Sequence, residues 1–120
     1  MTAKADTRAC DIPAPPAPLA LLNDAFRRDP TSGQLFATAG VISLGGTALP
    51  SVLELVRTFD AFTPDNDPYR EHIFGSFEWE GKRLFWKIDY YDRSLHFGSP
   101  DPLDPSVTTR VLTIMLASEY

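Results

Sequence analysis

The residues best suited to acid–base chemistry are the two histidines, His72 and His96, with Glu71 and Asp89 as nearby carboxylates. A catalytic histidine needs an orienting carboxylate and a nucleophile within hydrogen-bond reach. The histidines lie at the ends of the first and third strands of a predicted meander, where they could approach each other. Their spacing in the sequence does not require that they do. A small hydrolase or nuclease-like enzyme using this pair with carboxylates is therefore an alternative function, and no catalytic residue is assigned.

Metal and cofactor sites are not predicted. The run Asp65-Asn66-Asp67 places hard oxygen ligands at alternate positions, but the later ligands and the turn glycine of a calcium-binding loop are missing. One cysteine, Cys10, and two histidines cannot build a closed zinc site at this spacing. The pair Gly45-Gly46 lacks the lysine that follows a phosphate-binding loop. We expect no metal and no cofactor.

Acidic residues dominate the charge, with 16 Asp and Glu against 11 Lys and Arg and a formal net charge of -5. Such a field repels nucleic-acid phosphates and favours a protein partner with a basic surface, such as a nucleic-acid-handling complex. Prolines on both sides of the acidic run would hold its carboxylates at fixed spacing, which recognition of a basic surface requires. The residues predicted to bind the partner are Asp65, Asp67, Tyr69, Glu71, Tyr91 and Asp92.

The chain of 120 residues is long enough for one domain with one core. Residues 1–18 are rich in Ala and Pro, so they are predicted to be a disordered tail, and residues 19–120 a single domain. A single cysteine excludes a disulfide scaffold, and no apolar run of about 18 residues is present to span a membrane. The expected location is the cytoplasm, as a monomer or a homodimer.

The stretch that positions the candidate residues is His72–Gly98, where aromatic residues alternate with polar ones around short turns. It predicts a three-stranded antiparallel meander with a hairpin turn at Glu80-Gly81-Lys82. The expected core row is Leu84, Trp86, Ile88, Leu95 and Phe97. The opposite face would carry Phe74, Phe85 and Tyr91, covered by the first helix, by the first strand or by a partner protein.

The remaining elements are predicted from periodicity and caps. Helical spacing indicates helices over Leu19–Arg28 and Val52–Phe62, and small and β-branched residues favour a strand over Gln34–Leu44. Asp104 and Pro105 suit the start of a helix whose wide apolar arc continues to Leu116. The predicted class is α+β, in the order α-β-α-β-β-β-α. Its antiparallel sheet has the meander plus a possible fourth strand, packed by two or three helices.

Three strings carry a resemblance to a known family: FTPDNDPYREHIFGSFE (Phe62–Glu78), FWKIDYYDRSLHFGSPDP (Phe85–Pro102) and VTTRVLTIMLASEY (Val107–Tyr120). They resemble an uncharacterised bacterial domain-of-unknown-function family of short acidic proteins, often carried on plasmids and mobile elements. The resemblance extends back to residue 19 and implies no activity, cofactor or catalytic residue. The genetic context that it implies is one in which small acidic proteins include inhibitors of host defence.

The predicted function is accordingly a non-enzymatic protein-binding module that inhibits a host defence complex, as an anti-CRISPR or anti-restriction protein, through its acidic surface. Besides the hydrolase, a dimeric regulatory or antitoxin-like partner is the other alternative. It would associate through the meander edge or the outward aromatic residues.

Overall fold

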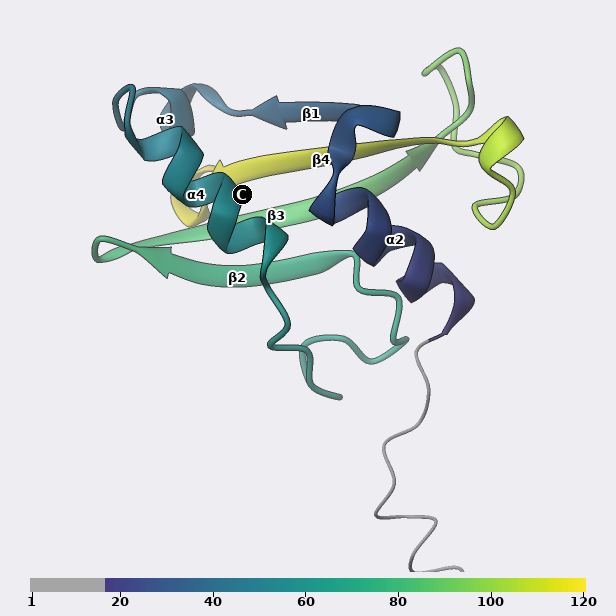
Figure 1. Cartoon of the computed structure of the whole chain (residues 1–120), viewed down its shortest axis with the longest axis horizontal. Coiled ribbons are helices and arrows are strands. Elements are labelled where there is room, and N and C mark those ends of the chain that lie inside the picture. Colours follow the sequence, from purple (N-terminus) through teal and green to yellow (C-terminus); the bar gives the residue numbers. More distant parts are fainter. Residues whose placement is uncertain (1–16) are drawn as a thin grey trace, which may run out of the picture.

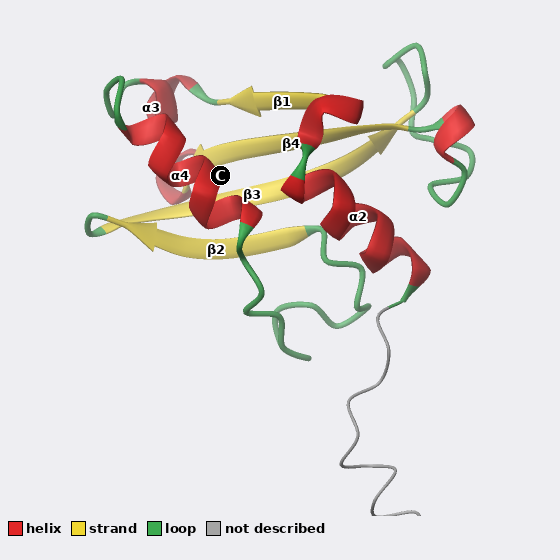
Figure 2. Cartoon of the chain, viewed as in Figure 1, coloured by secondary structure: helices red, strands yellow, loops and turns green. Residues whose placement is uncertain are grey.

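The computed structural model describes residues 17–120, which form one mixed sheet with every α-helix on the same face (Figure 1, Figure 2). The elements are α2 (Pro18–Arg28), β1 (Gln34–Ala37), α3 (Ala39–Ile42), α4 (Ala48–Arg57), β2 (Phe74–Trp79), β3 (Lys82–Tyr91) and β4 (Thr109–Leu116). This confirms the α+β class. The predicted tail falls mainly on residues 1–16, which lie outside the described residues.

The strand order is β1-β4-β3-β2, so β4, the last strand in the chain, lies inside the sheet. It pairs in parallel with β1 and antiparallel with β3. The β2–β3 hairpin is antiparallel and turns at Glu80 and Gly81, which both have positive φ. The predicted hairpin and its glycine are therefore confirmed.

The core lies between the helices and one face of the sheet. Proline at the start of α2 and arginines in its last turn suit the helix ends, and α4 buries Val52 and Val56. From the sheet, Leu84, Trp86 and Ile88 meet these helices, as predicted. The helix predicted to reach Phe62 ends at Arg57, yet Phe62 still packs against the core from the following loop.

The predicted C-terminal helix is wrong, because its residues form strand β4. The apolar residues of this segment cover too wide an arc for a surface helix because β4 is buried on both of its faces. It also pairs with a neighbouring strand on each edge. Leu112 and Ile114 are buried against the helices, while Val111 and Met115 are buried on the opposite face. A strand buried in this way has no polar alternation to distinguish it from a buried helix. The order is thus α-β-α-α-β-β-β.

The third meander strand is also absent. Leu95 and Phe97 were predicted to join the core, but they are 44% and 74% exposed. They lie in a tight turn in which the Asp92 carboxylate accepts hydrogen bonds from the backbone of His96, and Leu95 has a positive φ. Only Gly98 forms a bridge to Tyr91. The place beside β3 that a third meander strand would occupy is taken by β4.

The strand predicted over Gln34–Leu44 is shorter, since β1 ends at Ala37 and α3 begins at Ala39. The Thr38 hydroxyl accepts a hydrogen bond from the Val41 N–H and so caps α3. Gly40 therefore marks a helix rather than a bulge in a strand.

Gly75 provides a test of the core, because a Cβ atom there would lie 2.2 Å from Nε1 of the buried Trp86. We expect Gly75→Ala to lower the free energy of unfolding by about 1–3 kcal/mol, since the indole must shift in a packed core. Urea denaturation measures the change. Gly46→Ala is the matched control, because nothing lies within 4 Å of its Cβ position. Equal stability of the two variants would contradict the described packing.

Candidate functional site

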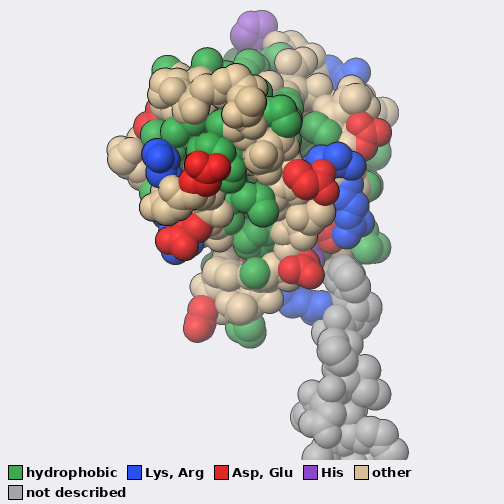
Figure 3. All heavy atoms as spheres, turned by 60° about the vertical axis from the view of Figure 1, so that its left-hand side comes forward, with side chains coloured by type: hydrophobic (Ala, Val, Ile, Leu, Met, Phe, Trp, Pro, Cys, Tyr) green, Lys and Arg blue, Asp and Glu red, His purple; other side chains and the backbone are tan. Residues whose placement is uncertain are grey.

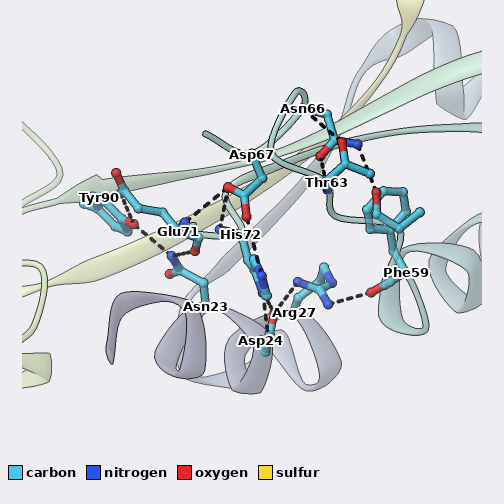
Figure 4. Close-up of polar contacts among 11 residues, drawn as sticks. Asn23, Asp24, Arg27, Phe59, Thr63, Asn66, Asp67, Glu71, His72 and Tyr90 are labelled. Atoms are coloured by element: carbon cyan, nitrogen blue, oxygen red, sulfur yellow. Dashed lines mark hydrogen bonds and ion pairs between the residues drawn. The ribbon is translucent and has the colours of Figure 1, made fainter. Parts of the chain in front are cut away.

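His72 lies at the centre of a partly buried polar cluster formed by α2 and the 63–72 loop (Figure 4). Its Nδ1 is 2.9 and 3.0 Å from the two carboxylate oxygens of Asp24, and its Nε2 is 3.5 Å from Oδ2 of Asp67. The imidazole stacks on Phe62 with ring centroids 3.7 Å apart. Both ring nitrogens thus face carboxylates of the chain itself.

Arg27 extends this cluster into the core, where its side chain is 1% exposed. Its guanidinium donates to Asp24 Oδ1 at 2.9 Å and to the backbone carbonyls of Val56 and Phe59. Burial lowers the pKa of Arg27, and the hydrogen bond to Asp24 opposes that shift. The cluster therefore joins α2 to the end of α4 and to the 63–72 loop.

A second group of polar side chains lies beside it. Asn23 donates to the backbone carbonyl of Glu71 and to the Tyr90 hydroxyl, and it accepts from Arg110 at 2.7 Å. The Tyr90 hydroxyl donates to the Glu71 carboxylate at 3.1 Å. Burial raises the pKa of Tyr90 and lowers that of Arg110. Glu71 was predicted to bind a partner, and the structure places it in this group instead. Sequence reasoning missed Asn23 and Arg110, although Asn23 shares a buried helical stripe with Ala20 and Arg27, which was an available signal.

A cavity of about 230 Å³ adjoins His72 and is lined by Phe62, Thr63 and Arg70 among others. The Thr63 hydroxyl accepts a hydrogen bond from the Asn66 backbone, so it is engaged in the turn. His96 lies instead in the exposed 92–98 turn beside Phe97. Among residues 17–120, no group of three His, Cys, Asp or Glu side chains could hold a metal ion. The two histidines thus have no contact residue in common.

The predicted partner-binding carboxylates have different surroundings. Asp65 is exposed, whereas Asp67 is 8% exposed and its Oδ1 accepts from the backbone N–H groups of Glu71 and His72. Those bonds support His72 in a left-handed conformation, with φ of 58°. Asp92 closes its own turn and has a lowered pKa, chiefly because the Ser94 hydroxyl donates to it. Only some of the predicted acidic site therefore points to solvent.

The two predicted tyrosines lie apart. Tyr69 is 81% exposed in the 63–72 loop, while Tyr91 is half-buried at the end of β3. Tyr91 belongs to the sheet face that carries no helix, which we call the open face. The side chains that define the open face are Gln34, Phe36, Phe74, Ser76, Glu78, Arg83, Phe85, Lys87, Asp89, Tyr91, Thr109, Val111, Thr113 and Met115.

The open face has two parts. At one end, Tyr120 covers Phe85 and Phe74, with ring centroids 5.4 and 6.0 Å away, so neither the first helix nor the first strand supplies the cover. At the other end, a hollow of about 380 Å³ lies between Phe36 and Leu95 and is floored by Val111 and Thr113. The Phe36 side chain is 53% exposed. The open face thus combines exposed aromatic area with a concave surface.

The position of Tyr120 depends on its neighbour Glu119. The Glu119 carboxylate accepts hydrogen bonds from the Thr38 hydroxyl, the Leu116 N–H and the Gly40 N–H, which fastens the 117–119 turn to the start of α3. These bonds, that of Thr38 most strongly, lower the pKa of Glu119. A Cβ atom at Gly40 would come 2.6 Å from this carboxyl group. We call these three hydrogen bonds the Glu119 clasp. The clasp holds the turn that precedes Tyr120, which covers one end of the open face.

A family model described as "Protein of unknown function (DUF3768)" matches residues 37–119. The match confirms the predicted resemblance to a domain-of-unknown-function family, although it begins after most of β1 rather than at residue 19. No curated protein and no solved structure matches the chain. Within residues 17–120, no helix is long and apolar enough to cross a membrane.

Asp67 and Asp65 differ in a measurable way. We expect Asp67→Ala to lower the free energy of unfolding by about 1–3 kcal/mol, because two partly buried backbone N–H groups lose their acceptor and His72 loses a neighbouring carboxylate. Asp65→Ala removes an exposed carboxylate two residues away and should change stability by less than about 0.5 kcal/mol. Urea denaturation of both variants measures the two changes in the free energy of unfolding. A larger loss in Asp65→Ala would contradict the described loop.

The lowered pKa of Glu119 predicts a pH dependence. A carboxylate whose pKa is lower in the folded chain stabilises it above the unfolded value of 4.5, and that stability is lost as pH falls through the folded pKa. At pH 7 the melting temperature of Glu119→Gln should lie below that of the wild type, and the two should converge in acid. Glu80→Gln, at the exposed β2–β3 turn, controls for the loss of one charge. A constant difference between wild type and Glu119→Gln at all pH values would argue against the clasp.

Proposed function

The chain belongs to the family described as Protein of unknown function (DUF3768), a description that assigns no activity, and we propose that it is a non-enzymatic protein-binding module acting through its open face. The observation that carries the proposal is the sheet face without helices, where Phe36 is 53% exposed beside a hollow of about 380 Å³. Exposed aromatic patches bordered by charge are typical of protein-binding surfaces.

The polar clusters support the same choice by elimination. His72 has both ring nitrogens against carboxylates, and the hydroxyl that lines its cavity, that of Thr63, is engaged in a turn. A nucleophile and a base within hydrogen-bond reach are what a hydrolase would need. The cluster provides His72 as a base but pairs it with no nucleophile, whereas the open face presents the exposed Phe36 beside a hollow.

A narrower version of the proposal gives the partner a basic surface. The partner would then be a nucleic-acid-handling defence complex, and the chain an anti-CRISPR or anti-restriction inhibitor that works in the cytoplasm of bacteria carrying it on mobile elements. The net charge of -5 supports this version, as do the exposed Asp65 and Tyr69 of the 63–72 loop. Against it, acidic and basic side chains are interspersed on the face seen in Figure 3, and Asp67 and Asp92 are engaged within the chain.

The test is co-purification with the tagged full chain from its native host. We expect Phe36→Lys to reduce the amount of bound protein at least about tenfold, because a charge is placed in the apolar contact. Leu21→Lys is the matched control, since Leu21 is 57% exposed on α2, on the helical side of the molecule. Circular dichroism checks that both variants fold. Undiminished binding by Phe36→Lys, or no protein bound by the wild type, would refute the proposal.

The same co-purification distinguishes the version with a basic partner from the open-face proposal in general. If the partner is recognised through its basic surface, Asp65→Asn should also weaken binding, more so at low salt. Full retention of the partner by this variant would exclude recognition through Asp65 and leave the open-face proposal in place.

A further inference from the structure

The charges of the open face cancel, although the whole chain is acidic. Two ion pairs lie on it: Lys87 Nζ is 3.0 Å from Asp89 Oδ2, and Arg83 Nη2 is 3.3 Å from Glu78 Oε2. No other charged residue occurs among the open-face positions of the four strands. Two copies of the chain can therefore meet at this face without the repulsion that their net charge of -5 would cause elsewhere.

The order of the central pair is self-complementary. Lys87 and Asp89 are two residues apart on β3, so they point to the same side and stand about 7 Å apart along the strand. Consider two sheets stacked with their open faces together, and a two-fold axis midway between them that runs perpendicular to the strands at the level of Ile88. This axis places β3 of the second copy over β3 of the first in the opposite direction. Lys87 of each copy then faces Asp89 of the other. This is the pattern an isologous contact requires.

The strands that would face each other are β3 and β4 together with β1, because β2 pairs only with Lys82–Lys87 and lies wholly on one side of an axis at Ile88. These strands present less than the roughly 800 Å² per partner of a standard interface, so the contact is a small one. Leu95 beside the hollow and Tyr120 over Phe85 are 44% and 78% exposed and extend the contact at the two ends of the face. The sheets would stack about 10 Å apart in the aligned manner of a β-sandwich.

A basic protein fits this face less well than a second copy does. Its positive groups would meet Lys87 and Arg83, whose side chains are 39% and 49% exposed. An acidic partner would meet Asp89 and Glu78 in the same way, with side chains 38% and 62% exposed. Only a surface of alternating sign, with an apolar remainder, complements it.

We propose that the open face binds a second copy of this chain, sheet against sheet about a two-fold axis, with Lys87 of each copy paired to Asp89 of the other. This inference rests on the proposed function, because it names the partner of the same face. The Lys87–Asp89 pairs of the two copies would then form one four-membered network, flanked by Phe85, Tyr91 and Phe36.

Charge exchange tests the proposal by sedimentation velocity over a range of concentrations at low salt. The wild type should show a concentration-dependent dimer. Lys87→Asp places Asp against Asp89, and Asp89→Lys places Lys against Lys87, so each variant alone should dimerise at least about tenfold more weakly. An equimolar mixture of the two variants should restore a heterodimer, and the double variant K87D/D89K should regain the homodimer. This rescue separates lost pairing from misfolding.

The matched control uses the exposed pair of Glu54 and Arg57 on α4, with side chains 62% and 54% exposed. Arg57→Asp and Glu54→Lys make the same charge changes on the helical side and should leave dimerisation unchanged. A wild type that stays monomeric at all concentrations, or a dimer that ignores the charge exchange at residues 87 and 89, would overturn the inference. In either case the proposed function survives if a different protein co-purifies with the wild type and is lost from Phe36→Lys. If nothing co-purifies as well, both fail.

Discussion

The pairing of β4 on both of its edges is the constraint on which the rest of the structure depends. Val111 to Ile114 of β4 pair with β1, while Thr109 to Leu116 pair with β3, so the strand joins an early segment of the chain to the later hairpin. Because the helices precede the hairpin and all pack on one side, the opposite side is left to Tyr120 and the side chains of the sheet. The open face is thus a result of topology rather than of local sequence.

The buried polar groups have a different role from the open face. Arg27 and Asp24 would be costly in the core if either lacked its partner, and together they join α2, α4 and the 63–72 loop. The carboxylate that orients His72 is the one that neutralises Arg27. An arrangement that looks like an acid–base pair in isolation is therefore explained by the cost of burying a guanidinium.

The elements that could be predicted are those whose sequence signals lie within their own segment. The two longer helices have helical periodicity in their own segments and the β2–β3 hairpin has a turn glycine, and these elements were predicted. Strand β4 was not, because Val111, Leu112, Ile114 and Met115 are all buried and give no alternation. Leu95 and Phe97 were assigned to the core because they are apolar, but apolar residues also occur on surfaces.

The candidate site was less predictable than the fold. Asp67 and Asp65 are indistinguishable by type and spacing, and only the backbone N–H groups that approach Asp67 separate them. The cover that Tyr120 gives to Phe85 depends on a contact between distant parts of the chain. The Lys87–Asp89 pair could be read from the alternation of β3, but its value as a self-complementary pair depends on the absence of helices over it.

The position of β4 also sets the order in which the molecule can assemble. Gln34 of β1 pairs with Val111, so neither β1 nor the helices that pack beside it can complete their core until β4 is in place. Contacts between such distant segments slow folding, since the loop entropy is lost before the contacts are gained. Phe26 and Val52 from the helices and Trp86 from β3 therefore reach their full burial only when β4 has joined β1 to β3.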